Sequence, residues 1–300
     1  MNIVFMGTPD YARVILERIL NEKINVLAVF TQPDKPVGRK QILTPPSVKQ
    51  FLLDKKSDIK ILQPKNLKDE SIHEFLRSLN PDFIVVAAYG QILPQAVLDI
   101  APCINLHASI LPKYRGASPI QSAILDGESE TGVCTMLMEA GLDTGDVLEV
   151  AKTSCLDKTS GELFDELAIM AAELIISTLR NFNQITPIKQ DDESATHCKK
   201  ITKQMGLVGF DDENFYNKYL AFTPWPGIFT KTGLKILNLK KSNLSGKVGE
   251  ILSINKQSFV VATKNSAIEI FTLQESGKRS VSATDFINGK RLKVGDIFES

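Results

Sequence analysis

The sequence predicts an α/β protein with two domains: a doubly wound, mostly parallel sheet, followed by a small all-β barrel or sandwich. The length of 300 residues, 33.1 kDa, suits two domains better than one. Apolar runs rich in β-branched residues alternate with helical patterns through the first half. The last third instead shows short strands separated by Gly, Asn and Ser.

The first half contains strand and helix patterns in strict alternation. Several strands are continuously apolar, as expected where a parallel sheet is covered on both faces. The alternation implies a doubly wound sheet. Strands are predicted at Asn2–Gly7, Ile24–Thr31, Ile59–Leu62, Phe83–Tyr89 and Cys103–His107, and helices at Pro9–Leu20, Ser47–Lys55 and Asp69–Leu79.

Two helices begin with capping signals. Thr8 before Pro9 predicts an N-cap and a first-position proline directly after the first strand. Thr159-x-x-Glu162 is a capping box and predicts a long helix that ends near Phe182. Two more strands are expected before that helix, at Gly132–Met138 and Val147–Ser154.

Residues 183–205 are polar and lack a periodic apolar pattern, which indicates a linker. We therefore predict a first domain at 1–188, a linker at 189–205 and a second domain at 206–300. After a short helical segment near Glu213–Phe222, strands are predicted at Lys235–Leu239, Val248–Ile254, Phe259–Thr263 and Ile268–Leu273.

The net charge of zero conceals an asymmetry. Residues 1–180 carry 18 Lys and Arg against 23 Asp and Glu, whereas residues 181–300 carry 17 against 12. The basic excess of the second part fits contact with a polyanion, although an ordinary solvated face is the alternative.

Composition excludes several classes of protein. Hydrophobic content of 43% and charged content of 23% are globular values. No apolar run is long enough to cross a membrane, and the first residues lack the features of a signal peptide, so we expect a cytoplasmic protein. The four cysteines are widely spaced and suggest neither a disulfide framework nor a zinc site.

The strongest candidate site follows the predicted strand Cys103–His107. Asn105 and His107 are two residues apart, so their side chains leave the same face of the strand. They lie at its carboxyl end, where open α/β sheets bind ligands. An isolated pair of this kind is more often structural, but the following loop, with two prolines and Arg115-Gly116, favours a built site.

A carboxylate could complete this site. Asp143 lies in the Gly-rich stretch Gly141–Gly145, where an Asp is commonly a turn former. The alternative is that it orients His107 and favours the charged imidazole. His73 borders an apolar helical stripe and is expected at the surface, while His197 belongs to the linker; neither is a strong catalytic candidate.

Phosphate-binding signatures are missing from the first turn, Gly7–Ala12. It lacks the Gly-x-Gly-x-x-Gly pattern, and Pro9 removes a donating amide, so an NAD-dependent oxidoreductase is a weak alternative. Residues 32–46 form a long βα loop with four prolines and three cations, and we interpret it as a stiffened basic arm for phosphate rather than surface decoration.

These segments together resemble the methionyl-tRNA formyltransferase family over essentially the whole chain. The most specific match is Asn105-x-His107-x-Ser109-Ile-Leu-Pro112-x-x-Arg115-Gly116, followed by Gly141-Leu142-Asp143-Thr144-Gly145. Related transferases that use 10-formyltetrahydrofolate share this pattern. Gly7-Thr8-Pro9-Asp10, Pro224-Trp225-Pro226 and Gly277-Lys278 look like the tRNA enzymes in particular.

The resemblance implies roles for individual residues. Asn105, His107 and Asp143 would be catalytic, and Ser109, Ile110, Leu111 and Pro112 would contact the folate. Contacts to tRNA would come from Arg39, Lys40, Lys200, Lys203, Lys278 and Arg279. The resemblance also implies 10-formyltetrahydrofolate as co-substrate, initiator methionyl-tRNA as partner and an OB-type barrel as second domain. Nothing in the sequence supports a metal, and we expect no membrane partner and a monomer.

Two other readings stay open. A formyltransferase that acts on an amino sugar nucleotide or on glycinamide ribonucleotide would share the central motif. A non-catalytic RNA-binding protein would fit the basic second half but would leave Asn105, His107 and Asp143 without a purpose. Residues 204–210 and Thr223 depart from the family pattern, which bears on the domain junction and not on the site.

Overall fold

The computed structural model describes residues 1–38 and 40–298. Its chain divides into two compact units. Unit 1 contains Met1–Pro119, Glu130–Ser154 and Leu163–Lys199; unit 2 contains Ile120–Ser129, Cys155–Glu162 and the residues from Lys200 onward. Because the units are interleaved in sequence, they do not test the contiguous division at 1–188, 189–205 and 206–300, which stays a prediction.

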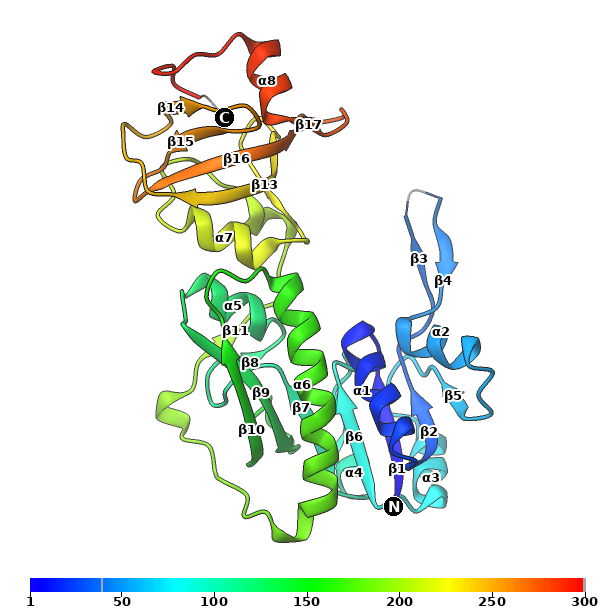
Figure 1. Ribbon diagram of the computed structural model, residues 1–300. Helices are drawn as coiled ribbons and strands as arrows, with labels where there is room; N and C mark the ends of the chain where they lie inside the picture. Colours follow the sequence, from blue (N-terminus) through cyan, green and yellow to red (C-terminus); the bar gives the residue numbers. More distant parts are fainter. Residues whose placement is uncertain (39, 299–300) are drawn as a thin grey trace. The chain divides into compact units, whose positions relative to one another are not determined.

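Unit 1 is built on a seven-stranded sheet with the order β10-β9-β7-β6-β1-β2-β5 (Figure 1). The central pairs are parallel, and β9 and β10 are antiparallel additions at one edge. This confirms the mostly parallel, doubly wound sheet. The strands are β1 (Asn2–Gly7), β2 (Asn25–Phe30), β5 (Lys60–Leu62), β6 (Phe83–Ala87), β7 (Cys103–His107), β9 (Glu130–Leu137) and β10 (Val147–Ser154).

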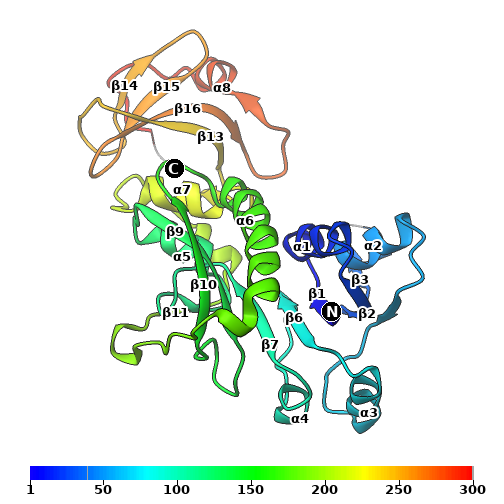
Figure 2. The ribbon, with the colours of Figure 1, turned by 60° about the horizontal axis from the view of Figure 1, so that its bottom comes forward.

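Helices cover both faces of this sheet (Figure 2). α1 (Asp10–Asn21) and α6 (Ser160–Asn181) lie on one face, where Arg18 and Glu173 pair at 2.7 Å. α3 (Glu70–Leu79) and α4 (Gln95–Leu98) lie on the other and pack against alternate strand residues such as Val4 and Met6. Burial of both faces explains the continuously apolar strands. Two further helices are α2 (Ser47–Asp54) and α5 (Pro119–Leu125).

Of the two predicted helix N-termini, one agrees with the structure and one does not. The capping box is confirmed: the amide of Thr159 donates to Glu162 at 2.7 Å, and the amide of Glu162 donates to Thr159 Oγ1 at 3.3 Å. The prediction of Thr8 as N-cap is wrong, because Pro9 is the N-cap of α1. The Thr8 hydroxyl instead donates to the carbonyl of Tyr89 at 3.0 Å, beyond the end of β6.

His73 also differs from expectation. It is buried, not exposed, and its Nε2 lies 2.7 Å from the carbonyl oxygen of Leu67. Glu70, one turn earlier on α3, lies 3.1 Å from its Nδ1. His73 therefore ties α3 to the preceding loop, a contact that helical periodicity alone does not reveal.

The long loop at 32–46 contains a short antiparallel hairpin that the sequence did not predict. β3 (Lys35–Val37) pairs with β4 (Ile42–Thr44), and the residues of both strands are exposed (Figure 1). At its base, Lys49 Nζ contacts Asp34 at 2.8 Å and Gln63 at 2.8 Å. Arg39 lies outside the described residues.

Unit 2 contains an antiparallel sheet, as expected for the second half of the chain. Its hydrogen-bonded path is β12-β13-β16-β15-β14, with β17 paired to β16, and it does not close into a barrel among the residues described. The rings of Phe210, Phe259 and Phe286 pack around Phe298. The elements are α7 (Phe215–Phe222), β12 (Ile228–Phe229), β13 (Lys235–Ser242), β14 (Ile251–Ile254), β15 (Phe259–Ala262), β16 (Ala267–Gln274), β17 (Val281–Ser282) and α8 (Ala283–Lys290).

Within the described part of the chain, no helix combines the length and the apolar character needed to span a membrane.

Candidate active site

Asn105 and His107 lie near the carboxyl end of β7, between β6 and β9. Their neighbours on β9 are Met136 and Cys134. His107 is buried and Asn105 is partly exposed. Among the described residues, the Asn105 side chain has no hydrogen-bond partner, so its amide can donate to a ligand.

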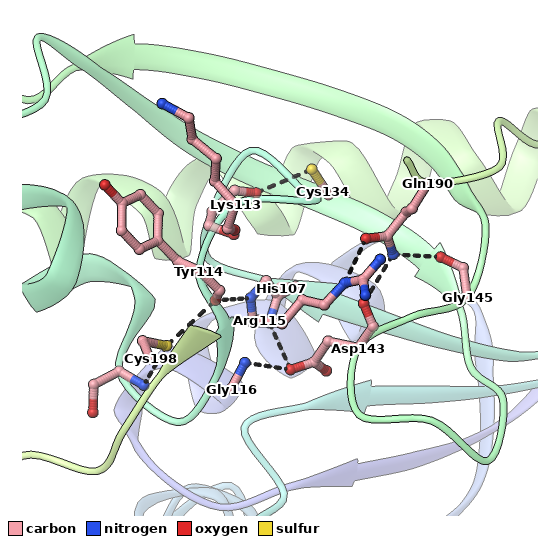
Figure 3. A network of polar contacts seen from close by, with 12 residues as sticks. His107, Lys113, Tyr114, Arg115, Gly116, Cys134, Asp143, Gly145, Gln190 and Cys198 are labelled. Atoms are coloured by element: carbon pink, nitrogen blue, oxygen red, sulfur yellow. Dashed lines mark hydrogen bonds and ion pairs between the residues drawn. The ribbon is translucent and has the colours of Figure 1, made fainter. Parts of the chain in front are cut away.

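Both nitrogens of the His107 ring face a polar group (Figure 3). Nε2 lies 2.9 Å from the carbonyl oxygen of Tyr114. A carbonyl only accepts, so Nε2 carries the hydrogen and donates it. Nδ1 lies 3.7 Å from Asp143 Oδ2. In the neutral ring, Nδ1 is therefore the nitrogen that carries no hydrogen.

Asp143 is held in place by the backbone of the short strand β8 (Arg115–Gly116). Its Oδ2 accepts a hydrogen bond of 2.8 Å from the amide of Gly116. Gly116 has φ +120°, and a Cβ there would lie 2.3 Å from the carbonyl oxygen of Cys198, so only glycine fits. Asp143 itself has φ 54°, a left-handed conformation that Asp tolerates better than most residues.

A second layer of contacts comes from the segment that follows α6. Gln190 is buried and donates from Nε2 to the carbonyls of Asp143 (2.8 Å) and Gly145 (2.7 Å). Its Oε1 accepts from Arg115 Nε at 3.0 Å, and Arg115 Nη2 pairs with Asp192 at 2.8 Å. Figure 3 shows how these side chains meet around the Asp143 loop.

The segment predicted to contact a folate, Ser109 to Pro112, follows β7 directly. Ser109 is buried, and its hydroxyl donates to the carbonyl of Lys113 at 2.6 Å. Leu111 is buried against Cys134, Met136 and Val147. Ile110 and Pro112 are partly exposed. Ile110 and Pro112 are therefore the residues of this segment whose side chains are accessible to a ligand.

The predicted tRNA-contacting cations belong to both units. Lys40 is exposed in unit 1, and the other four described candidates, all exposed, lie in unit 2: Lys200, Lys203, Lys278 and Arg279. Lys278 pairs with Glu275 at 2.6 Å, and Lys290 pairs with the same carboxylate at 2.9 Å. These cations lower the pKa of Glu275 to about 2.

The cysteines do not suit nucleophilic catalysis. All four are buried, and burial raises the pKa of Cys103 to about 12 and that of Cys134 to about 11. Both thiols are protonated at neutral pH, and the thiolate is the reactive form. No group of three or more potential metal ligands occurs in residues 1–38 and 40–298.

Sequence reasoning missed three contributors to this site. The Tyr114 carbonyl and the Gly116 amide are main-chain groups and leave no side-chain signal. Gln190 lies in a polar stretch that resembles a linker. The sequence does indicate that Arg115-Gly116 belongs to a loop built for a ligand. The contacts of this pair, however, are made with residues 190–198, which follow α6 in the chain.

Comparison with known proteins places this site in a family. Residues 1–179 match the family model described as formyl transferase, and residues 200–291 match the model of the formyl transferase C-terminal domain. The methionyl-tRNA formyltransferase of Campylobacter curvus is 57% identical over 298 residues, which are 99% of this chain and 99% of that protein. The chain belongs to the methionyl-tRNA formyltransferase family.

Solved structures support the fold of this formyltransferase family. Methionyl-tRNA formyltransferase from Clostridium thermocellum matches 81% of this chain and 94% of its own, with a TM-score of 0.57 and 19% identity. An N-formyltransferase from Helicobacter canadensis, in complex with folinic acid and dTDP-3-aminofucose, matches 90% of this chain and 98% of its own, with a TM-score of 0.68 and 18% identity.

A longer protein contains the same fold. HypX from Aquifex aeolicus, in complex with tetrahydrofolic acid, matches 97% of this chain with a TM-score of 0.64 and 17% identity. This chain spans 48% of the HypX chain.

Proposed function

We propose that the protein transfers the formyl group of 10-formyltetrahydrofolate to the α-amino group of methionine esterified to initiator tRNA. One observation supports this most directly: 57% identity to a methionyl-tRNA formyltransferase along 99% of both chains. Both formyl transferase family models match as well, one at residues 1–179 and the other at residues 200–291.

The reaction needs no nucleophilic side chain. An α-amino group titrates at about 7.7 to 8.0 and lower still in an ester, so enough of the neutral amine exists at physiological pH to attack the formyl carbon. The enzyme must stabilise the oxyanion of the tetrahedral intermediate and take up the proton that the nitrogen loses.

Asn105, His107 and Asp143 are assigned to these tasks. The Asn105 amide would donate to the oxyanion. His107 would take the proton at Nδ1, since Nε2 already donates to the carbonyl of Tyr114 at 2.9 Å. When the tetrahedral intermediate collapses, the bond between the formyl carbon and N10 breaks, and this proton would pass to N10, so that tetrahydrofolate leaves. Asp143 would stabilise the resulting imidazolium, for which its position 3.7 Å from Nδ1 is suited.

Binding of the two substrates is assigned to separate surfaces. Ser109 to Pro112 would contact the folate, chiefly through Ile110, Pro112 and main-chain atoms. Arg39 and Lys40 would contact the acceptor end of the tRNA. Unit 2 would serve as an OB-type tRNA-binding domain, with Lys200, Lys203, Lys278 and Arg279 contacting phosphates. The protein would act as a cytoplasmic monomer in translation initiation.

The alternative is a formyltransferase for amino sugar nucleotides. The N-formyltransferase from Helicobacter canadensis shares the fold, but at 18% identity it supports the fold alone. The much higher identity to a tRNA enzyme favours the tRNA substrate.

One experiment separates these substrates. The protein is incubated with 10-formyltetrahydrofolate and, in parallel, with charged initiator tRNA, a dTDP-amino sugar or glycinamide ribonucleotide. We expect N-formylmethionyl-tRNA and no other formylated product. Formylation of the sugar nucleotide or of the ribonucleotide in preference to the tRNA would overturn the proposal.

A further inference from the structure

Gln190 connects three groups around the candidate site. Its two N–H donors bind the carbonyl oxygens of Asp143 and Gly145 at 2.8 and 2.7 Å, and its oxygen accepts from Arg115 at 3.0 Å. The side chain is only 7% exposed, so water does not replace these bonds easily. The amide thus holds the main chain from Asp143 to Gly145 in one conformation.

We propose that Gln190 is a positioning residue for formyl transfer, which acts by holding the Asp143 carboxylate against His107. The proposal rests on the proposed function, in which Asp143 assists His107. It adds a residue from outside the central motif, supplied by a segment whose sequence resembles a linker.

The segment that carries Gln190 is fixed on both sides of it. Before it, Ile188 and Val147 exchange main-chain hydrogen bonds of 2.8 and 2.9 Å. After it, β11 (His197–Cys198) pairs with β8 (Arg115–Gly116). Gln190 is therefore placed by the sheet edge and by strand β8, which presents the Gly116 amide, and not by a free loop.

The chemistry of the site requires an amide at this position. Asp143 and Gly145 present two acceptors, and buried Arg115 presents a donor. Of the uncharged side chains of this size, only Gln and Asn offer two N–H donors and an oxygen acceptor on one planar group. Asn is one methylene shorter.

The decisive variant is Gln190→Glu, which keeps the size and the acceptor for Arg115 but removes both donors. A carboxylate would then face two carbonyl oxygens, and the Asp143 loop would shift. We expect kcat for charged initiator tRNA to fall by about 10- to 100-fold, because small misplacements of a catalytic group have effects of this order. KM for the folate and for the tRNA should stay within about twofold, since Gln190 contacts neither substrate in this assignment.

Two further variants distinguish the loss of the Gln190 donors from the effect of an added charge and from an effect on folding. Gln184→Glu makes the same change at an exposed residue of the same connecting segment, and it should leave kcat unchanged. Gln190→Ala removes the donors without adding a charge and should show the same loss of kcat as Gln190→Glu. Thermal unfolding of each variant is followed in parallel, and loss of a cooperative transition in both Gln190 variants would overturn the proposal by assigning Gln190 to stability alone.

A double-mutant cycle identifies the group through which Gln190 acts. In an Asp143→Ala background, measured under single-turnover conditions, Gln190→Glu should cause no further loss beyond about twofold. An equal additional loss would overturn the proposal, as would a folded Gln190→Glu variant with normal kcat or with a changed KM only. Failure of the wild-type protein to formylate charged tRNA would instead refute the proposed function.

Discussion

His107 takes its tautomer from the main chain and not from a side chain. The Tyr114 carbonyl accepts from Nε2 at 2.9 Å, so the ring is oriented before any substrate binds. Sequence reasoning assigns this task to Asp143. The structure instead places Asp143 Oδ2 at 3.7 Å from the other ring nitrogen, Nδ1. The main chain thus orients the ring from one side, and the carboxylate lies beside its other nitrogen.

Asn105→Ala tests the oxyanion donor. Loss of one such donor typically lowers kcat by about 100- to 1,000-fold. Stability should change little, because among the described residues the Asn105 side chain has no hydrogen-bond partner to leave unpaired. Formyl transfer kinetics and thermal unfolding measure the two effects. Near-normal turnover in a folded Asn105→Ala protein would remove Asn105 from the mechanism.

Sequence periodicity predicts pairs such as Asn105 and His107 because they are two residues apart on one strand and so share a face. It does not predict Gln190, which reaches the site only after the chain has passed through β9, β10 and α6. The wrong expectation for His73 has a similar origin, since its partner is a carbonyl in the preceding loop. Contacts between a side chain and a distant or main-chain partner leave no local pattern.

The hairpin β3–β4 shows the limit of predicting elements from sequence. Each strand has three residues, all of them exposed, and β3 contains Pro36, so neither hydrophobic alternation nor length indicates them. The long, apolar or capped elements are predicted well, with strands β1 and β7 and helix α6 near their observed bounds. Tertiary burial explains this, because buried elements carry the periodic pattern.

Arg39→Ala tests the loop that carries this hairpin. A charge-assisted hydrogen bond to phosphate is worth about 1.5 to 3 kcal/mol, so kcat/KM for charged tRNA should fall by about 10- to 150-fold. Folate affinity, measured by fluorescence titration, should not change. Lys68→Ala, at an exposed residue outside the hairpin, is the matched control. Equal activity of the two variants would exclude Arg39 from tRNA contact.

The number of basic residues overstates the positive charge that is available to bind tRNA, because some lysines are already paired with carboxylates. Residues 181–300 carry 17 basic against 12 acidic residues, yet Lys278 and Lys290 share the carboxylate of Glu275. With a pKa of about 2, this carboxylate stays ionised throughout the physiological range. It therefore competes with any phosphate that Lys278 would bind.

Glu275→Gln removes the carboxylate that pairs with Lys278 and Lys290, so both lysines become free to contact phosphate. We expect tighter binding of tRNA and a steeper dependence of log affinity on log salt, by up to about 0.7 to 0.9 for each additional phosphate that the protein neutralises. Binding is measured by filter retention at several salt concentrations. Glu213→Gln frees Lys264 in the same unit and serves as control, because Lys264 is not among the predicted tRNA contacts. Unchanged binding in Glu275→Gln would argue against phosphate contact by Lys278.

The anchoring of residues 188–198 sets a lower limit on how far the chain can be shortened. A fragment that stops at residue 188 would retain Asn105, His107 and Asp143, but it would lack Gln190, the second strand beside Arg115-Gly116 and the ion-pair partner of Arg115. Such a fragment would keep the Tyr114 carbonyl and the Gly116 amide beside His107 and Asp143, but it would lose the contacts through which Gln190 holds the Asp143–Gly145 segment and Arg115.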